Sequence, residues 1–180
     1  ADGSWRPPPS IADGVYTLPI FSTKFCKLLY EELKAFSRSG LPCGRPNSMN
    51  RFGMLLDELG LTPGLITPLV RDYVRPLAAC LAPLAAVGGG AIDHHKAFVV
   101  AYRMGEDEEL SQHFDNAEVT LNANLGVDFE GGELVFYGHK DRAGDTPVAC
   151  HEWTSESGGL EIGHGVLHLG AQVDGAHSIA

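Results

Sequence analysis

Hydrophobic and polar positions divide the chain into a helical first half and a second half with strand periodicity. Apolar residues recur at helical spacing in residues 25–36 and again in residues 67–84. In the second half, residues 118–125 alternate between apolar and polar side chains, which is typical of a strand with one buried face. This change of period predicts an α+β fold in which helices precede a sheet.

Residue types at the segment ends predict the elements of the first quarter of the chain. Residues 14–20 have the β-branched and aromatic content of a short strand. Ser22 or Thr23 is expected to cap the first helix, and Gly40 to end it. Residues 52–61 fit either a strand or a short helix, because the run is too short to separate the two periods.

A second helix and then a series of strands are expected in the remainder. The helix opens at Thr67, is kinked at Pro76, which lacks a backbone donor, and ends near Leu84. Gly88–Gly90 then break the chain. The strands predicted after this break cover residues 97–102, 111–115, 118–125, 133–137, 160–169 and 172–179. Many short strands after helices indicate a jelly-roll-like double sheet with helices packed on its outside.

Composition narrows the class of protein. A length of 180 residues suits one domain, and the net charge of −10 makes nucleic acid an unlikely partner. No apolar run is long enough to span a bilayer. The four cysteines have no metal-binding spacing and are expected to be free thiols in the core. We therefore expect a soluble protein and favour an intracellular location.

His113 and Asp115 are the centre of the candidate chemistry. Two residues apart on an extended segment, they point to the same side and can reach one metal ion. They supply two-thirds of a facial triad, in which two histidines and one carboxylate bind a ferrous ion and leave other positions open. H-x-D alone is a weak signal. Its setting strengthens it, because inward polar residues, a double glycine and a histidine-rich hairpin follow.

Four segments around this pair carry a likeness to a known family. They are FVVAY at 98–102, HFDNAEVTLN at 113–122, FEGGE at 129–133 and GVLHLG at 165–170. They resemble the 2-oxoglutarate- and iron(II)-dependent dioxygenases and, more distantly, the catalytic domain of procollagen lysyl hydroxylase. The likeness extends upstream to GVYTLPIF, GRPNSMN and LLDELGL, so it covers nearly the whole chain.

The resemblance implies a double-stranded β-helix, also described as jelly-roll or cupin-like. Residues 1–90 would be its helical support and residues 91–180 its core, without the last strand. The implied activity is that of a hydroxylase that uses Fe(II) and 2-oxoglutarate, is helped by ascorbate, and acts on a side chain of a protein or peptide. The alternatives are a catalytically inactive jelly-roll binding domain and a cupin-like metalloenzyme that does not use 2-oxoglutarate.

The third metal ligand is where this chain departs from the family. The resemblance implies a distal histidine, and counting along the motif places Asp174 at that position. Asp174 is the first choice, since carboxylates are good ligands for a ferrous ion. His177 would need a β-bulge to reach the metal. His168, on the preceding strand, is the remaining alternative.

The resemblance also implies a cosubstrate pocket. Tyr102 is expected to point into the barrel and donate a hydrogen bond to 2-oxoglutarate, while its neighbour Arg103 points outward. Asn122 or Thr120 is expected to line the same pocket. The resemblance also implies a basic residue that anchors the carboxylate of 2-oxoglutarate farther from the metal. No lysine or arginine follows Arg142, and the family pattern places this anchor beyond Ala180.

Overall fold

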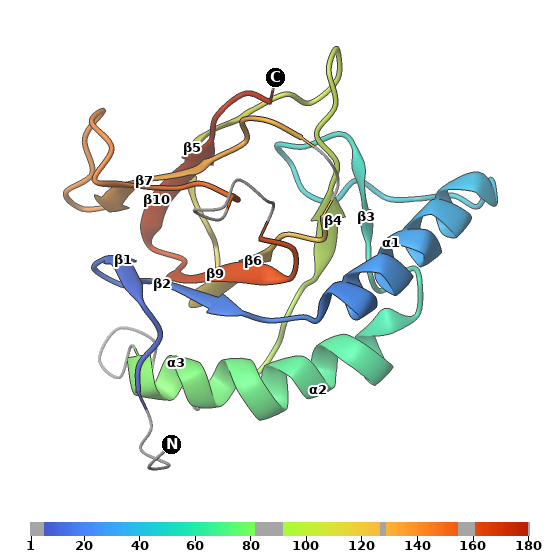
Figure 1. Ribbon diagram of the computed structural model, residues 1–180, viewed down its shortest axis with the longest axis horizontal. Helices are drawn as coiled ribbons and strands as arrows, with labels where there is room; N and C mark the ends of the chain where they lie inside the picture. The colour runs from blue at the N-terminus through green and yellow to red at the C-terminus, as the bar shows by residue number, and fades with distance from the viewer. Residues whose placement is uncertain (1–5, 82–91, 127–128, 155–160, 180) are drawn as a thin grey trace.

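The computed structural model describes residues 6–81, 92–126, 129–154 and 161–179. Within these residues the chain forms two four-stranded sheets, one two-stranded sheet and several helical segments (Figure 1). The pairings between the described strands are antiparallel. This mixed helix-and-sheet architecture agrees with the predicted jelly-roll-like fold.

The first sheet has the strand order β1-β2-β9-β6. Its strands are β1 (Ser10–Ala12), β2 (Val15–Pro19), β9 (His164–Leu169) and β6 (Val119–Ala123). Two of them come from the N-terminal end of the chain, and β2 pairs with β9 along its whole length. Residues 82–91 lie outside the described residues, so the predicted boundary at residue 90 and the break at Gly88–Gly90 stay predictions.

The second sheet has the order β5-β10-β7-β8. Its strands are β5 (Leu110–Phe114), β10 (Gln172–Ala176), β7 (Leu134–His139) and β8 (Ala149–His151). The central strand β10 is shorter than the predicted segment 172–179, and Ile179 makes only an isolated bridge to Gly131. β10 pairs with β5 on one side and with β7 on the other.

Helix α1 (Thr23–Arg38) begins and ends close to the predicted residues. Ser22, rather than Thr23, is its N-cap, and the Ser22 hydroxyl accepts a hydrogen bond of 3.2 Å from the backbone N–H of Phe25. The helix buries one face, which contains Leu29 and Leu33. With Leu56 and Ile66 these leucines form a hydrophobic cluster beside the sheets.

The second helical segment differs from the prediction, because it begins at Thr62 rather than Thr67. It comprises wide π-type turns at Thr62–Ile66 and Val70–Val74, α2 (Thr67–Leu69) and α3 (Arg75–Leu81). Pro63 is tolerated in its first turn, where a backbone donor is not needed. A wide turn precedes Pro76, as expected where a proline interrupts the regular hydrogen-bond pattern.

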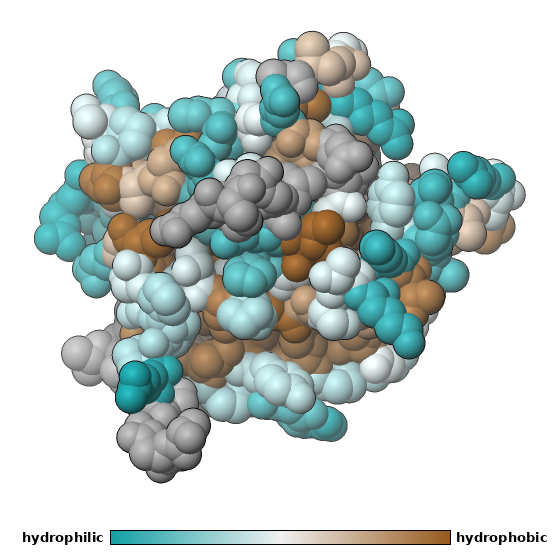
Figure 2. Space-filling model, in the orientation of Figure 1, coloured by the Kyte–Doolittle hydropathy of each residue, from teal (hydrophilic) through white to brown (hydrophobic). Residues whose placement is uncertain are grey.

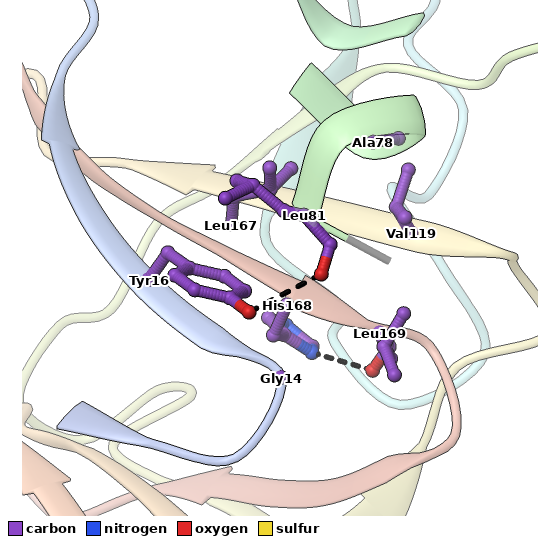
Figure 3. A pocket seen from close by; sticks show the side chains of 8 residues that line it. All are labelled: Gly14, Tyr16, Ala78, Leu81, Val119, Leu167, His168 and Leu169. Atoms are coloured by element: carbon purple, nitrogen blue, oxygen red, sulfur yellow. Dashed lines mark hydrogen bonds between the residues drawn. The ribbon is translucent and has the colours of Figure 1, made fainter. Parts of the chain in front are cut away.

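Helix α3 packs on the outer face of the first sheet, as Figure 3 shows. Leu167 and Val119 face the helix beside Ala78, and the Tyr16 hydroxyl donates a hydrogen bond of 3.3 Å to the carbonyl of Leu81. Figure 2 shows apolar residues gathered in the band between this sheet and the helices. Among the described helices, none has the length and apolar character that crossing a bilayer requires.

Strands β3 (Gly53–Leu55) and β4 (Phe98–Val100) pair with each other. Part of the ambiguous segment 52–61 is therefore a strand. The prediction for residues 97–102 was wrong in extent and burial, since β4 has three residues and Phe98 is 37% exposed. The other two residues of β4 are half-buried, and Val99 packs against the cluster that contains Leu29 and Leu33.

Residues of the two main sheets pack together in an apolar core. Val15, Val166, Leu134, Phe136 and Ala176 form a buried hydrophobic cluster there.

The cysteine prediction holds only in part: all four cysteines are free, and Cys26 is buried, whereas the other three are exposed.

Candidate metal centre

The second sheet brings together two residues that are far apart in the sequence. His113 on β5 and Asp174 on β10 are register partners, so their side chains leave adjacent strands side by side. Asp115 follows β5 directly. Ligand atoms of His113, Asp115 and Asp174 all lie within 4.8 Å of one another. This spacing allows one cation to contact all three.

The loop that carries Asp115 is held by a close approach to the β9–β10 turn. The backbone N–H of Asp115 donates a 2.9 Å hydrogen bond to the carbonyl of Gly170. A Cβ atom at Gly170 would lie 1.9 Å from the carbonyl oxygen of Ala117, so only glycine fits without displacing the loop. The position of Asp115 therefore depends on a residue of the opposite turn.

His113 is oriented by its own strand. Its Nδ1–H donates a 3.1 Å hydrogen bond to the carbonyl of Ser111, which leaves Nε2 to face Asp115 Oδ1 at 3.6 Å. The interaction with the Asp115 carboxylate raises the pKa of His113 to about 9. A backbone carbonyl on the second ring nitrogen is the usual arrangement of a metal-binding histidine.

Asp115 has one oxygen engaged and one available. The Thr120 hydroxyl donates a 2.5 Å hydrogen bond to Asp115 Oδ2, while Oδ1 faces His113. Interaction with His113, reinforced by the Thr120 hydrogen bond, lowers the pKa of Asp115 despite partial burial. The carboxylate is therefore ionised at neutral pH and can donate Oδ1 to a cation.

Asp174 is the most deeply buried of the three, with 3% exposure. None of the described residues donates a hydrogen bond to its Oδ1. Burial raises the pKa of this carboxyl. β10 also has an irregular register against β7 between Val173 and Asp174, and such bulges commonly re-aim a side chain at a functional site.

These three residues fit a divalent metal ion. A buried carboxylate oxygen without a donor is costly in a folded protein unless a cation or another partner satisfies it. A single imidazole and two carboxylates are suitable donors for ferrous and similar ions. An octahedral ion held by three protein donors would have further positions for other ligands.

The other two candidates for the third ligand lie elsewhere. Both ring nitrogens of the buried His168 are engaged: Nδ1–H donates to the carbonyl of Leu169 at 2.9 Å, seen in Figure 3, and Nε2 accepts from Asn122 at 3.3 Å. The His177 side chain is 57% exposed and lies 3.5 Å from Glu133. Of the three, only Asp174 lies in the cluster with His113 and Asp115.

Tyr102 and Asn122 are both half-buried, and Tyr102 is close enough to Asp174 to be affected by its charge. Burial raises the pKa of Tyr102 to about 12, and the charge of Asp174 contributes to this rise. Arg103, by contrast, is exposed and pairs with Glu106 at 3.6 Å. Asn122 on β6 is tied to His168 by the hydrogen bond described above.

Asn50 is a residue near this site that the sequence reasoning missed. It is 1% exposed, and its side chain lies close enough to the Tyr102 hydroxyl to lower the pKa of that group. Asn47 holds it in place, since the Asn47 side-chain amide donates to Asn50 Oδ1 at 3.0 Å. The segment was recognised as a loop rich in turn formers and as part of the family likeness, but no local signal links Asn50 to Tyr102.

Residues 8–87 match the family model of the OGFOD2-like domain. The chain is 47% identical over 165 residues to the 2-oxoglutarate and iron-dependent oxygenase domain-containing protein 2 of Mus musculus, which covers 92% of this chain and 45% of that protein. It is 34% identical over 177 residues to the 2-oxoglutarate and iron-dependent oxygenase domain-containing protein ICU11 of Arabidopsis thaliana, and the match covers 92% of this chain and 42% of that protein.

A weaker likeness links the chain to human procollagen-lysine,2-oxoglutarate 5-dioxygenase 1. The identity is 28% over 132 residues, covering 68% of this chain and 18% of that protein. The chain spans less than half of the length of each of these relatives. These comparisons confirm the family resemblance that the motifs predicted.

Proposed function

Because the chain carries an OGFOD2-like domain and resembles 2-oxoglutarate- and iron-dependent oxygenases, we propose that it is an Fe(II)- and 2-oxoglutarate-dependent hydroxylase. The observation that carries the proposal is the convergence of His113, Asp115 and Asp174 within 4.8 Å. In this proposal the two main sheets are the walls of a double-stranded β-helix, with residues 1–90 as support and 91–180 as its core.

The proposed roles of the metal-binding residues follow from their contacts. Iron bound here would supply the chemistry that couples oxygen and 2-oxoglutarate to hydroxylation of a C–H bond. His113 binds through Nε2, because Nδ1 is engaged with Ser111. Asp115 binds through Oδ1, because Thr120 engages Oδ2. Asp174 binds through Oδ1, which has no other partner among the described residues.

Tyr102 and Asn122 are proposed to orient the cosubstrate. The Tyr102 phenol stays protonated at any physiological pH, because its pKa is raised to about 12, so it acts as a hydrogen-bond donor to a carboxylate. Asn50 takes no direct part in the chemistry in this proposal. It fixes the position of the Tyr102 hydroxyl from a loop in the first half of the chain.

The substrate proposed is a side chain of a protein or peptide. Support comes from the weakly similar procollagen-lysine dioxygenase, whose name specifies a lysine of procollagen. Ascorbate is proposed as an activator that keeps the iron reduced.

The proposal is tested by measuring succinate release from 2-oxoglutarate with Fe(II) and ascorbate, using a chain extended past Ala180, where the family pattern places the cosubstrate anchor. Replacing His113 or Asp115 by alanine is expected to abolish the release, because each supplies a metal ligand. The matched control is His94→Ala, since the His94 side chain is 93% exposed and lies outside the cluster.

The alternatives predict different results in the same experiment. Metal binding with no consumption of 2-oxoglutarate favours a cupin-like metalloenzyme that does not use this cosubstrate. Neither metal binding nor turnover favours a non-catalytic jelly-roll binding domain. The observation that motivates both alternatives is the presence of a carboxylate, Asp174, where the family pattern has a histidine.

A further inference from the structure

We infer that Asp174 sets the metal preference of this site, shifting it towards cations that favour oxygen ligands compared with a site of two imidazoles and one carboxylate. The inference rests on the metal-binding part of the proposed function and does not depend on turnover. It concerns which divalent ion the chain selects, a property that the side chains of the cluster determine directly.

The donor set is unusually rich in oxygen. His113 contributes one imidazole nitrogen, while Asp115 and Asp174 each offer a carboxylate oxygen. The two other histidines considered as ligands do not supply a second nitrogen: both ring nitrogens of His168 are hydrogen-bonded, and His177 lies beside Glu133. The cluster therefore has one nitrogen and two oxygen donors.

Asp174 is placed to bind a cation and not merely to add charge. It lies on the central strand of its sheet, paired on both sides, so its backbone is fixed. The side chain is 3% exposed, and its Oδ1 has no hydrogen-bond partner among the described residues. A buried oxygen left without a donor next to two other ligand atoms is what a cation site requires.

The consequence for metal selection follows from ligand chemistry. Imidazole nitrogen favours the later divalent ions such as Ni²⁺, whereas carboxylate oxygen suits Mn²⁺ and Mg²⁺. Affinity for Ni²⁺ exceeds that for Mn²⁺ at most protein sites, so the relevant quantity is the ratio of the two dissociation constants. Two carboxylates and one imidazole should make this ratio smaller than two imidazoles and one carboxylate.

The test compares Mn²⁺ and Ni²⁺ binding to the native metal-free chain and to two variants. In Asp174→His, the preference for Ni²⁺ over Mn²⁺ is expected to grow by about tenfold or more. In Asp174→Asn, which keeps the size of the side chain, Mn²⁺ affinity is expected to fall more than Ni²⁺ affinity. Circular dichroism of each variant verifies its fold.

A second measurement on the native chain needs no variant. Nitrogen couplings to bound Mn²⁺, measured by pulsed electron paramagnetic resonance, are expected to show one imidazole ligand. Two imidazole ligands in the native chain, or a Ni²⁺ preference that both variants leave unchanged, would overturn the inference. So would a native chain that binds neither ion. Absence of succinate release with the expected metal preference would refute the proposed hydroxylase activity and leave this inference standing.

Discussion

Asp174 on β10 and His113 on β5 are direct register partners in the second sheet. Partners on adjacent antiparallel strands have Cβ atoms about 5 Å apart on the same face. A carboxylate and an imidazole separated by most of the second half of the chain are thus brought into one cluster by strand pairing. The predictions below follow from this arrangement and from the residues that support it.

Removing the charge of Asp174 should stabilise the metal-free protein. Its pKa is raised by burial, so the proton-bound form is favoured in the fold. The stability that this protonated carboxyl contributes is fully present below the pKa of the unfolded chain and is lost as pH rises through the raised pKa of the folded protein. At pH 7, Asp174→Asn is therefore expected to raise the free energy of unfolding by about 1 kcal/mol, or the melting temperature by about 2–4 °C.

The same variant should lose the stabilisation that metal gives to the native chain, because binding to the folded state raises the melting temperature. Thermal unfolding with and without Mn²⁺ measures both effects. Asp145→Asn is the control, since Asp145 is exposed. An Asp174→Asn variant that is both less stable without metal and equally stabilised by metal would contradict the assignment.

Metal binding should release a proton from His113. With its pKa raised to about 9, His113 is protonated in the metal-free protein at pH 7.5, and the cation must displace that proton. Affinity is therefore expected to rise by about tenfold per pH unit from pH 7 to 9 and then level off. Calorimetry in buffers of different ionisation enthalpy measures the proton count.

The stability of the metal-free protein should have the opposite pH dependence to metal affinity, because of the same His113 side chain. The raised pKa of His113 stabilises the native state below about pH 6.5, the usual value for histidine, and this contribution is lost as pH rises through about 9. Metal binding with no net proton release at pH 7.5 would show that His113 is not a ligand.

Gly170→Ala should weaken metal binding without touching a ligand. A side chain here meets the Ala117 carbonyl, so the loop that carries Asp115 must move. The expected cost is about 1–3 kcal/mol of stability together with a lower metal affinity. Gly144→Ala is the matched control, because a Cβ there meets no atom within 4 Å. Equal metal affinities for the two variants would mean that Gly170 does not position Asp115.

Tyr102→Phe should weaken 2-oxoglutarate binding and leave metal affinity unchanged. A hydrogen bond to a charged group contributes about 1.5–3 kcal/mol, so a loss of about tenfold or more in cosubstrate affinity is expected. Tyr73→Phe, which alters a residue that is 64% exposed, is the control. Unchanged 2-oxoglutarate affinity in Tyr102→Phe would remove Tyr102 from the cosubstrate pocket.

Local patterns predicted several elements closely. Ser22 and the apolar spacing after it were sufficient for α1, because capping and helical periodicity act over a few residues. The start of the second helical segment was missed, because Thr67-Pro68 resembles a helix start although the helical turns already begin at Thr62. Strand β1 was also missed, since three residues carry too little pattern.

The sequence by itself determined the likeness to the dioxygenase family and the shared direction of His113 and Asp115, because side chains two apart on a strand always share a face. It favoured Asp174 as the third ligand but did not exclude His177 and His168. Only the tertiary structure placed Asp174 opposite His113 and the Asn50 side chain against Tyr102. The register between distant strands depends on contacts across the whole fold, and no local spacing encodes it.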